Sequence, residues 1–429
     1  MRAPMFSLIL LALAAPQVHA FELKTDDEGH SVAWARAEVV YRMEAQGARD
    51  LTEAASLRAV KGAFGAWDQA AEGLRIRFGG VVSNVAVGFD REAGAQNANV
   101  VHFSRDVWSF DSPTALAVTL TTYRAGGGGL VDADIVVNET HYAWSEGPEG
   151  DHDLQNTLAH EAGHFLGLAH SAEAEATMYA RATPHETKKR DLHLDDVQGV
   201  QRLYGGDWVP PEAGTESELE AEPPGGCQAG PWAASPPLWV WIFGVAGLLA
   251  LRRRRALAVV AVFGGLFMAE GQAQASAFRA LSLEGLAERA DFVVEGPVVA
   301  VTARWEGGLI ITHALIRVEV CHLGRCPAEV LARTVGGRVG DLIQEAEGLA
   351  HFDLGEQALV FMGPARPDGA RAVIGAGQGK FSVLPGPDGG WAFRSLHPLP
   401  LVGPEAPAAR AWRAVPAASL RAALAALRR

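Results

Sequence analysis

A stretch near the middle of the chain limits the fold more than any other feature of the sequence. Residues 207–237 combine Pro, Gly and acidic residues with few large apolar side chains, so this linker cannot bury a core. Two apolar runs follow, in residues 238–255 and 256–275, with Arg252 to Arg255 between them. The chain is therefore expected to fold as separate domains on either side of this stretch.

The apolar runs have more than one interpretation. Each has 14 residues, fewer than the roughly 20 that a membrane-spanning helix needs, and a block of arginines cannot lie in mid-bilayer. The first interpretation is a tight membrane hairpin with the arginines on the cytoplasmic side, as the positive-inside rule prefers. Two buried core helices are an alternative.

The second interpretation is a sorting signal. The segment "GGCQAG", the first apolar run and the arginines together resemble a myxobacterial-type C-terminal sorting tail. Residues 256–275, with their apolar run and "QAQA", resemble a second signal peptide, so the chain would be two secreted proteins fused in one frame. Both interpretations place the flanking domains outside the cytoplasm and predict contact with the membrane or cell envelope through residues 238–269.

The N-terminus also indicates export. Residues 1–20 contain Arg2, an apolar run from Phe6 to Ala15 and small residues before a cleavage point at Phe21. A membrane anchor is the alternative, but the apolar run is too short to span a bilayer. We expect a signal peptide and a protein that is secreted or anchored to the cell envelope.

Composition excludes two further classes of protein. The net charge of −13 argues against a nucleic-acid partner, because phosphate binding needs a basic face. Three cysteines in 429 residues exclude a disulfide-rich scaffold. Cys321 and Cys326 are close enough to form a small disulfide loop in an oxidising compartment, or else they are two buried thiols.

The hydrophobic patterns predict different folds for the two flanking domains. Residues 21–206 mix period-two and helical patterns, which favours an α/β (α+β) domain. Residues 276–429 carry alternating β-branched segments and predict a mostly-β domain, in which no pattern indicates chemistry. In the first domain strands are expected at 37–43, 74–80, 99–104, 115–123 and 133–138, and helices at 52–72, from 151–153 onward and at 194–205.

The segment "LAHEAGHFLGLAHSAEAEATMYA" carries the chemistry of the first domain. His160 and His164 lie one helical turn apart, so both can bind one ion, and Glu161 lies beside them to act as a proton acceptor. Gly167 allows the helix to end in a left-handed turn, which brings His170 back as a third ligand. Three imidazoles leave one position open, as a catalytic zinc site requires.

The same segment has an alternative interpretation and contains a further residue of interest. An Ala-rich helix with surface histidines is the alternative, but the added Gly167 and His170 make a chance match rare. Met178 follows His170 by eight residues, where a methionine can form an apolar floor under the histidines. Taken alone, Met178 would be an ordinary core residue.

With these residues, the segment about 37–206 resembles the matrixin branch of the metzincin zinc peptidases, to which Ser171 after the third histidine also points. The resemblance implies a zincin-like domain with a mixed twisted sheet and an active-site helix. It further implies a catalytic Zn²⁺ on His160, His164 and His170, with Glu161 as general base and Met178 in a structural turn.

The same resemblance gives roles to two other parts of the domain. Asp195 and Asp196 would be buried and would tie the last helix to the turn, although an exposed acidic pair at a helix start is the alternative. A strand at a sheet edge would pair with an extended protein or peptide substrate. The residues of this edge strand are Leu116, Ala117, Val118 and Thr119.

The sequence also departs from the family pattern. Val136 and "RAGGGG" stand where the vertebrate-type enzymes bind a structural zinc, so no second zinc is expected. Asn138 and His141 stand where acidic calcium ligands would be expected, which leaves Ca²⁺ only through Asp132 or Asp134. Fewer than twenty residues, none of them cysteine, separate the expected signal peptide from the first strand. We therefore expect neither a cysteine-bearing prosegment nor latency through a thiolate on zinc.

We therefore expect a secreted or surface-anchored zinc endopeptidase that hydrolyses protein substrates with metal-activated water and a glutamate base. The alternative is an exported binding or anchoring protein with a vestigial zinc site, whose function would lie in residues 276–429. Intact Glu161 argues against the alternative, because a non-catalytic zinc site has no use for a base.

Overall fold

The structure is a computed structural model. It describes most of the residues on either side of the central stretch. All of the residues that it describes belong to one compact unit of the chain. None of their helices combines the length and the apolar character needed to cross a membrane. The signal peptide predicted at 1–20, apart from Ala20, lies outside the described residues. So do the linker predicted at 207–237 and the apolar runs predicted at 238–255 and 256–275. The described ranges are 20–92, 97–106, 108, 110, 115–205, 281–386, 389–394 and 414–427.

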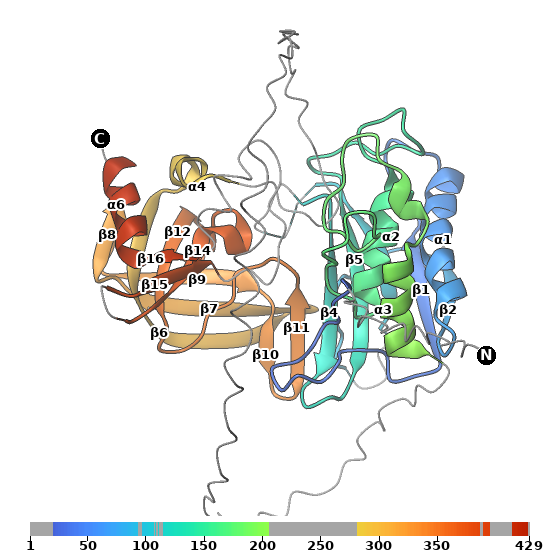
Figure 1. Ribbon diagram of the computed structural model, residues 1–429, viewed down its shortest axis with the longest axis horizontal. Helices are drawn as coiled ribbons and strands as arrows, with labels where there is room; N and C mark the ends of the chain where they lie inside the picture. Colours follow the sequence, from blue (N-terminus) through green and yellow to red (C-terminus); the bar gives the residue numbers. More distant parts are fainter. Residues whose placement is uncertain are drawn as a thin grey trace, which may run out of the picture. The chain divides into compact units, whose positions relative to one another are not determined.

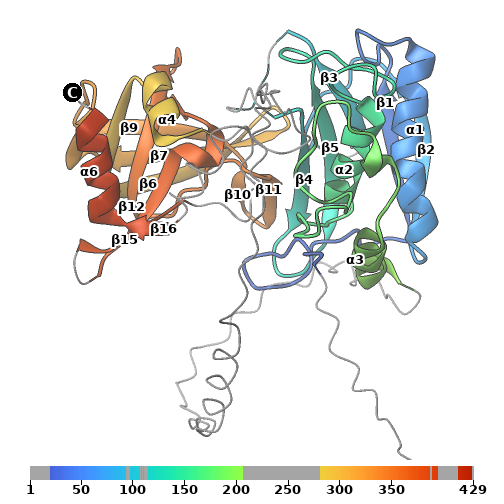
Figure 2. The same ribbon diagram turned by 45° about the horizontal axis from the view of Figure 1, so that its top comes forward.

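The first domain is a mixed sheet with three helices beside it, as the sequence predicted (Figures 1 and 2). Within the domain the strand order is β4-β5-β3-β1-β2; β4 runs antiparallel to β5, whereas β5, β3, β1 and β2 run parallel to one another. The elements are β1 (Glu38–Glu44), α1 (Glu53–Ala70), β2 (Arg75–Val82), β3 (Asn99–Ser104), β4 (Ala117–Arg124), β5 (Leu130–Asn138), α2 (Leu154–Phe165), η1 (Lys188–Arg190) and α3 (Leu194–Tyr204).

Helix α1 shows why local sequence determines these elements. Thr52 caps its N-terminus by accepting a hydrogen bond from the Ala55 amide, at 3.1 Å. Phe64 and Trp67 are buried in the main apolar core, and the Trp67 indole donates to the Ala159 carbonyl of α2 at 2.8 Å. This bond fixes α1 against the helix that carries the histidines.

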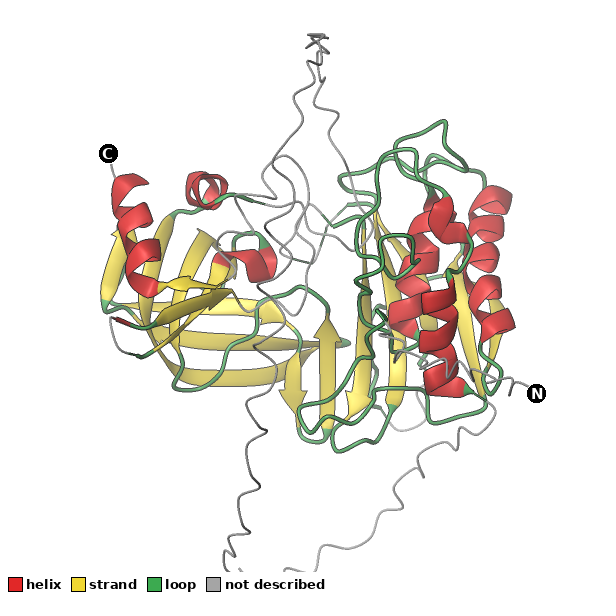
Figure 3. Ribbon diagram, in the orientation of Figure 1, coloured by secondary structure: helices red, strands yellow, loops and turns green. Residues whose placement is uncertain are grey.

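The C-terminal part is rich in strands, as predicted, and Figure 3 shows how strands predominate there. Strands β6, β7, β9, β13 and β12 close into a ring, because β12 pairs with β6 as well as with β13. Cys321 and Cys326 form a disulfide, which decides between the two alternatives. The elements are α4 (Leu283–Arg289), β6 (Phe292–Glu306), β7 (Leu309–Arg317), β8 (Val320–Leu323), β9 (Glu329–Val335), β12 (Gln357–Ala365), β13 (Arg371–Val373), η2 (Ala376–Gly379), β14 (Lys380–Leu384), β15 (Trp391–Arg394), β16 (Ala414–Pro416) and α6 (Ala417–Leu427).

A hairpin from the C-terminal part joins the sheet of the first domain. It consists of β10 (Gly337–Val339) and β11 (Leu342–Ala346), and β11 pairs antiparallel with β4 (Figures 1 and 2). The ladder runs from Leu342 opposite Arg124 to Ala346 opposite Leu120. Along these residues β4 is therefore not a free edge, which the sequence patterns did not predict.

Candidate metal centre

Helix α2 places the first two histidines on one face. Asp153 caps the helix by accepting from the Asn156 amide at 2.7 Å. At the other end the Leu168 amide donates to the Gly163 carbonyl at 3.0 Å and the Gly167 amide to the His164 carbonyl at 2.9 Å, which is a Schellman motif. Gly167 has φ +92°, and a Cβ there would lie 2.0 Å from the Val32 carbonyl oxygen. Only glycine fits the turn that returns the chain toward His170.

The structure brings His160, His164 and His170 together, all buried. The Nε2 atom of His170 lies 3.2 Å from that of His160 and 3.2 Å from that of His164. On the opposite side of the rings, the Nδ1 atom of His160 donates to the Thr177 carbonyl at 2.7 Å and that of His164 to the Leu168 carbonyl at 2.8 Å. The Nδ1 donors fix both tautomers, so the Nε2 lone pairs face one point.

This donor set fits zinc. Three imidazole nitrogens within 4.8 Å of one another suit Zn²⁺, which takes nitrogen ligands in tetrahedral geometry. Burial holds the pKa of His160 well below its usual value, and the Lys189 ammonium adds to this effect. Burial likewise lowers the pKa of His164. Both imidazoles are therefore neutral at pH 7, which is the form that binds metal.

The side chain of Glu161, on α2, contacts β4. It is fully buried, and its Oε2 atom accepts a hydrogen bond from the Thr119 hydroxyl at 2.6 Å. Burial raises the pKa of Glu161, while His164 and Thr119 oppose the rise. Thr119, one of the four residues expected in the edge strand, thus contacts Glu161, the expected general base. The ladder between β11 and β4 does not extend to Ala117, Val118 or Thr119.

Met178 packs against α2 at Gly163, between His160 and His164. A Cβ added to Gly163 would come within 2.1 Å of the Met178 sulfur and 2.9 Å of Trp67, so glycine is required where helix and methionine meet. The amides of Thr177 and Met178 donate to the Asp196 carboxylate at 2.7 and 2.8 Å. This carboxylate therefore fixes the turn beneath the histidines.

The two aspartates at the start of α3 are buried, as the family resemblance implied. Asp196 also accepts the His193 amide, within a capping box. Asp195 accepts the Ser171 hydroxyl at 2.6 Å and the Phe21 amide at 3.0 Å. The alternative of an exposed acidic pair is wrong, because the two residues expose only 7% and 1% of their surface.

Two charged residues near the histidines were not singled out from the sequence. Lys189 is fully buried, its Nζ lies 3.4 Å from the Nδ1 atom of His160, and burial lowers its pKa to about 7. The carboxylate of Glu347 lies 2.8 Å from the Nδ1 atom of His170 and 3.2 Å from that of His164. Its position depends on the β11–β4 pairing, for which local sequence holds no signal.

The residues expected near a calcium site are also described. The Asn138 side chain already has partners, since it accepts the His141 amide at 3.1 Å and donates to the Ala115 carbonyl at 2.8 Å. Asp134 accepts the Val100 amide at 2.8 Å. Both carboxylate oxygens of Asp132 are buried without a hydrogen-bond partner among the described residues.

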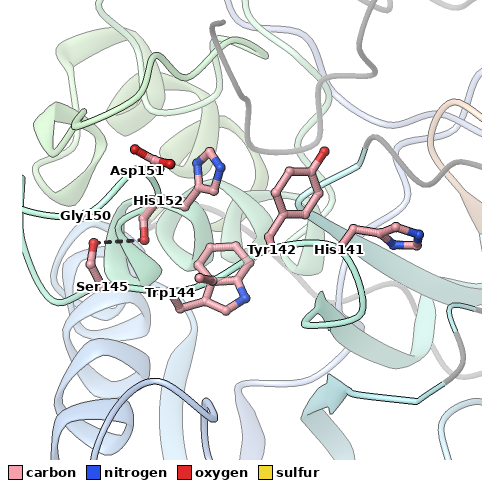
Figure 4. Close-up of a pocket in the computed structure, with 8 residues that line it drawn as sticks. His141, Tyr142, Trp144, Ser145, Gly150, Asp151 and His152 are labelled. Atoms are coloured by element: carbon pink, nitrogen blue, oxygen red, sulfur yellow. Dashed lines mark hydrogen bonds between the residues drawn. The ribbon is translucent and has the colours of Figure 1, made fainter.

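A separate hollow of about 190 Å³ lies just before α2, and Figure 4 shows its lining. The Ser145 hydroxyl there donates to the His152 carbonyl at 3.0 Å (Figure 4). None of the three clustered histidines lines this hollow. The residues that line it are His141, Tyr142, Ala143, Trp144, Ser145, Gly150, Asp151 and His152.

One helix beside the sheet carries two histidines and a glutamate, and a third histidine follows a glycine turn. This arrangement is that of a metal-dependent hydrolase site. Residues 33–205 match the model of the matrixin family, so this part of the chain is a matrixin domain. The match agrees with the resemblance that the histidine segment carries.

Individual matrix metalloproteinases are also similar to this chain. Human neutrophil collagenase is 31% identical over 175 residues, which cover 40% of this chain and 33% of that protein. Human matrilysin is 29% identical over 180 residues, covering 41% and 60%. Metalloendoproteinase 1-MMP of Arabidopsis thaliana is 53% identical over 53 residues, covering 12% and 14%. The chain thus spans about a third of the length of neutrophil collagenase.

Proposed function

We propose that this protein is a zinc-dependent endopeptidase that hydrolyses peptide bonds in protein substrates. The observation that carries the proposal is the convergence of three buried Nε2 atoms beside Glu161 in a matrixin domain. The names of the matched relatives, which include a collagenase, support a protein substrate. The sequence alternative of a vestigial site gains no support from this geometry.

Each residue has a role in this proposal. His160, His164 and His170 would hold Zn²⁺, which when bound supplies a Lewis acid that polarises the scissile carbonyl and acidifies water. Glu161 takes the proton from the attacking water and delivers it to the leaving amine. Burial raises the pKa of Glu161 and so makes it a stronger proton acceptor, while the Thr119 hydroxyl orients its carboxylate.

Leu116, Ala117, Val118 and Thr119 would bind the substrate as an added strand. Main-chain hydrogen bonds to such a strand hold any extended peptide, so side-chain selectivity must come from other parts of the site. Thr119 connects this strand with Glu161. A peptide bound along these residues would therefore lie beside the proposed base.

We also propose that the protein works outside the cytoplasm. The Cys321–Cys326 disulfide supports this location, because such bonds persist in oxidising compartments. Residues 1–20 would direct secretion, and residues 238–269 would anchor the chain to the cell envelope. A mass spectrum of the mature protein identifies its two ends. It therefore tests whether residues 1–20 are removed and whether the chain still contains residues 238–269.

The test of the function uses the purified full chain. Zinc content is measured by atomic absorption, and cleavage of a casein-type substrate is followed with and without a zinc chelator. His160→Ala should lose zinc, whereas Glu161→Gln should keep zinc and lose cleavage. Glu284→Gln, at an exposed position on α4, is the matched control. The proposal would be overturned if the parent chain and Gln344→Pro, a variant in strand β11, both hold zinc and neither cleaves protein.

A further inference from the structure

We propose that the β10–β11 hairpin of the C-terminal part is a built-in inhibitor of the matrixin domain. Strand β11 pairs with residues 120–124 of β4, and Glu347, which directly follows it, contacts His164 and His170. This inference rests on the proposed function, since an inhibitor requires an activity to inhibit. It gives the C-terminal part a function that neither its sequence nor the comparisons assign.

The backbone of β11 occupies the outer side of β4. Five residue pairs join the strands, from Leu342 opposite Arg124 to Ala346 opposite Leu120. The Ala125 amide donates to the Asp341 carbonyl at 2.9 Å, and the Thr121 hydroxyl donates to the Glu345 carbonyl at 3.3 Å. An extended peptide that adds to a sheet edge uses the same backbone groups. Residues 116–119, which would bind the substrate, lie directly beyond the end of this ladder. A substrate strand that continues along β4 past Thr119 and strand β11 therefore exclude each other.

Buried side chains hold β11 in this register. Gln344 is fully buried, and its amide donates to the Thr122 hydroxyl at 3.1 Å and to the Gly308 carbonyl at 3.0 Å. Its carbonyl oxygen accepts the Ile310 amide at 2.7 Å. Gln344 thus bonds to the matrixin domain and to the C-terminal part at once. A shift of register would leave this buried amide unpaired, which is costly.

Apolar packing and charge reinforce the contact. Ile343 belongs to the main core of the matrixin domain. Lys24 pairs with Glu345 at 3.1 Å, and although burial opposes the shift, this cation holds the pKa of Glu345 below its usual value. One apolar cluster contains residues of both parts, namely Phe110, Ala115, Val118, Leu120, Val136, Ile311, Val335, Ala346 and Ala376.

Glu347 lies just after the end of β11, beside two of the three histidines. It directly follows Ala346, whose partner Leu120 is next to Thr119 on β4. Its carboxylate lies 2.8 Å from the Nδ1 atom of His170 and 3.2 Å from that of His164. These contacts are on the Nδ1 side of the rings, away from the Nε2 atoms that would hold zinc. Glu347 therefore ties the end of β11 to two of the histidines while the strand covers β4.

The test uses the zinc-loaded full chain and two readouts. Hydrogen exchange of peptides covering residues 120–124 reports the pairing, and cleavage of a casein-type substrate reports inhibition. Gln344→Pro removes the buried amide and a backbone donor from β11, and Glu347→Gln removes only the charge. Glu329→Gln, at an exposed position on β9, is the matched control. Unchanged exchange in α2 and β12 shows that a variant is folded.

We expect exchange in residues 120–124 to rise at least about tenfold in Gln344→Pro, together with a similar rise in cleavage rate. Glu347→Gln should keep the protection of β4 and cleave no faster than the parent chain, because its carboxylate lies on the side of the rings away from the zinc position. Glu329→Gln should match the parent chain. Equal exchange in the parent chain and Gln344→Pro would overturn the pairing.

Other outcomes would overturn the inhibition. Exchange that rises without faster cleavage, in a parent chain that is already active, would leave the proposed function intact and exclude an inhibitory hairpin. Faster cleavage by Glu347→Gln with β4 still protected would show that Glu347, and not the pairing of β11, limits cleavage. If every folded, zinc-loaded variant fails to cleave, the proposed function itself is wrong, and the inhibitor falls with it.

Discussion

At the scale of single residues, two glycines on neighbouring helices provide a direct test of the packing around the metal centre. A Cβ at Gly163 would meet the Met178 sulfur at 2.1 Å, whereas a Cβ at Gly65 on α1 would meet no atom within 4 Å. We expect Gly163→Ala to destabilise the protein by about 1–3 kcal/mol through overpacking. Gly65→Ala should stabilise it by about 0.5–1 kcal/mol, because alanine favours a helix. Denaturant unfolding of both variants measures the difference, and equal effects would contradict the described contact.

At the scale of elements, Glu295 joins β6 to β8 and α6. Its carboxylate accepts from His322 at 2.8 Å and pairs with Arg421. Burial would raise the pKa of Glu295, but His322 and Arg421 outweigh it and lower the pKa to about 2. A depressed pKa in the folded state stabilises the protein above the unfolded value, and this stabilisation is lost as pH falls toward 2. The shift corresponds to about 3 kcal/mol.

We therefore expect the stability of the C-terminal part to fall between about pH 4.5 and pH 2. Glu295→Gln should be less stable at pH 7, because it leaves Arg421 and His322 without their carboxylate, and should lack most of this pH dependence. Unfolding followed at several pH values measures both effects. A parent and a variant with the same pH profile would show that the Glu295 contacts do not contribute.

At the scale of the whole molecule, zinc is expected to stabilise the matrixin domain. An ion that binds only the folded state stabilises it by about 2.7 kcal/mol at a hundred times its Kd. A chelator should therefore lower the unfolding temperature of the full chain, and His170→Ala should remove this difference. A chelator effect of the same size in His170→Ala would place the zinc at another site.

How far the sequence predicted the molecule depends on the range of each interaction. Thr52, Asp153 and Gly167 set helix ends through contacts within a few residues, so the helices and the return of His170 were predictable. The pairing of β11 with β4 joins residues more than 200 positions apart. An exposed strand edge offers backbone groups that suit almost any partner strand, so no local pattern identifies the one that binds. Glu347 was missed for the same reason.

The most direct test of the central claim compares two zinc-loaded variants of the full chain. Gln344→Pro should free β4 and cleave a casein-type substrate. Adding Glu161→Gln to it should leave the zinc content unchanged and lower the cleavage rate by about 10²–10⁴-fold, which is the usual contribution of a general base. Equal cleavage by the single and the double variant, at equal zinc content, would contradict the assignment of Glu161 and with it the metallopeptidase site.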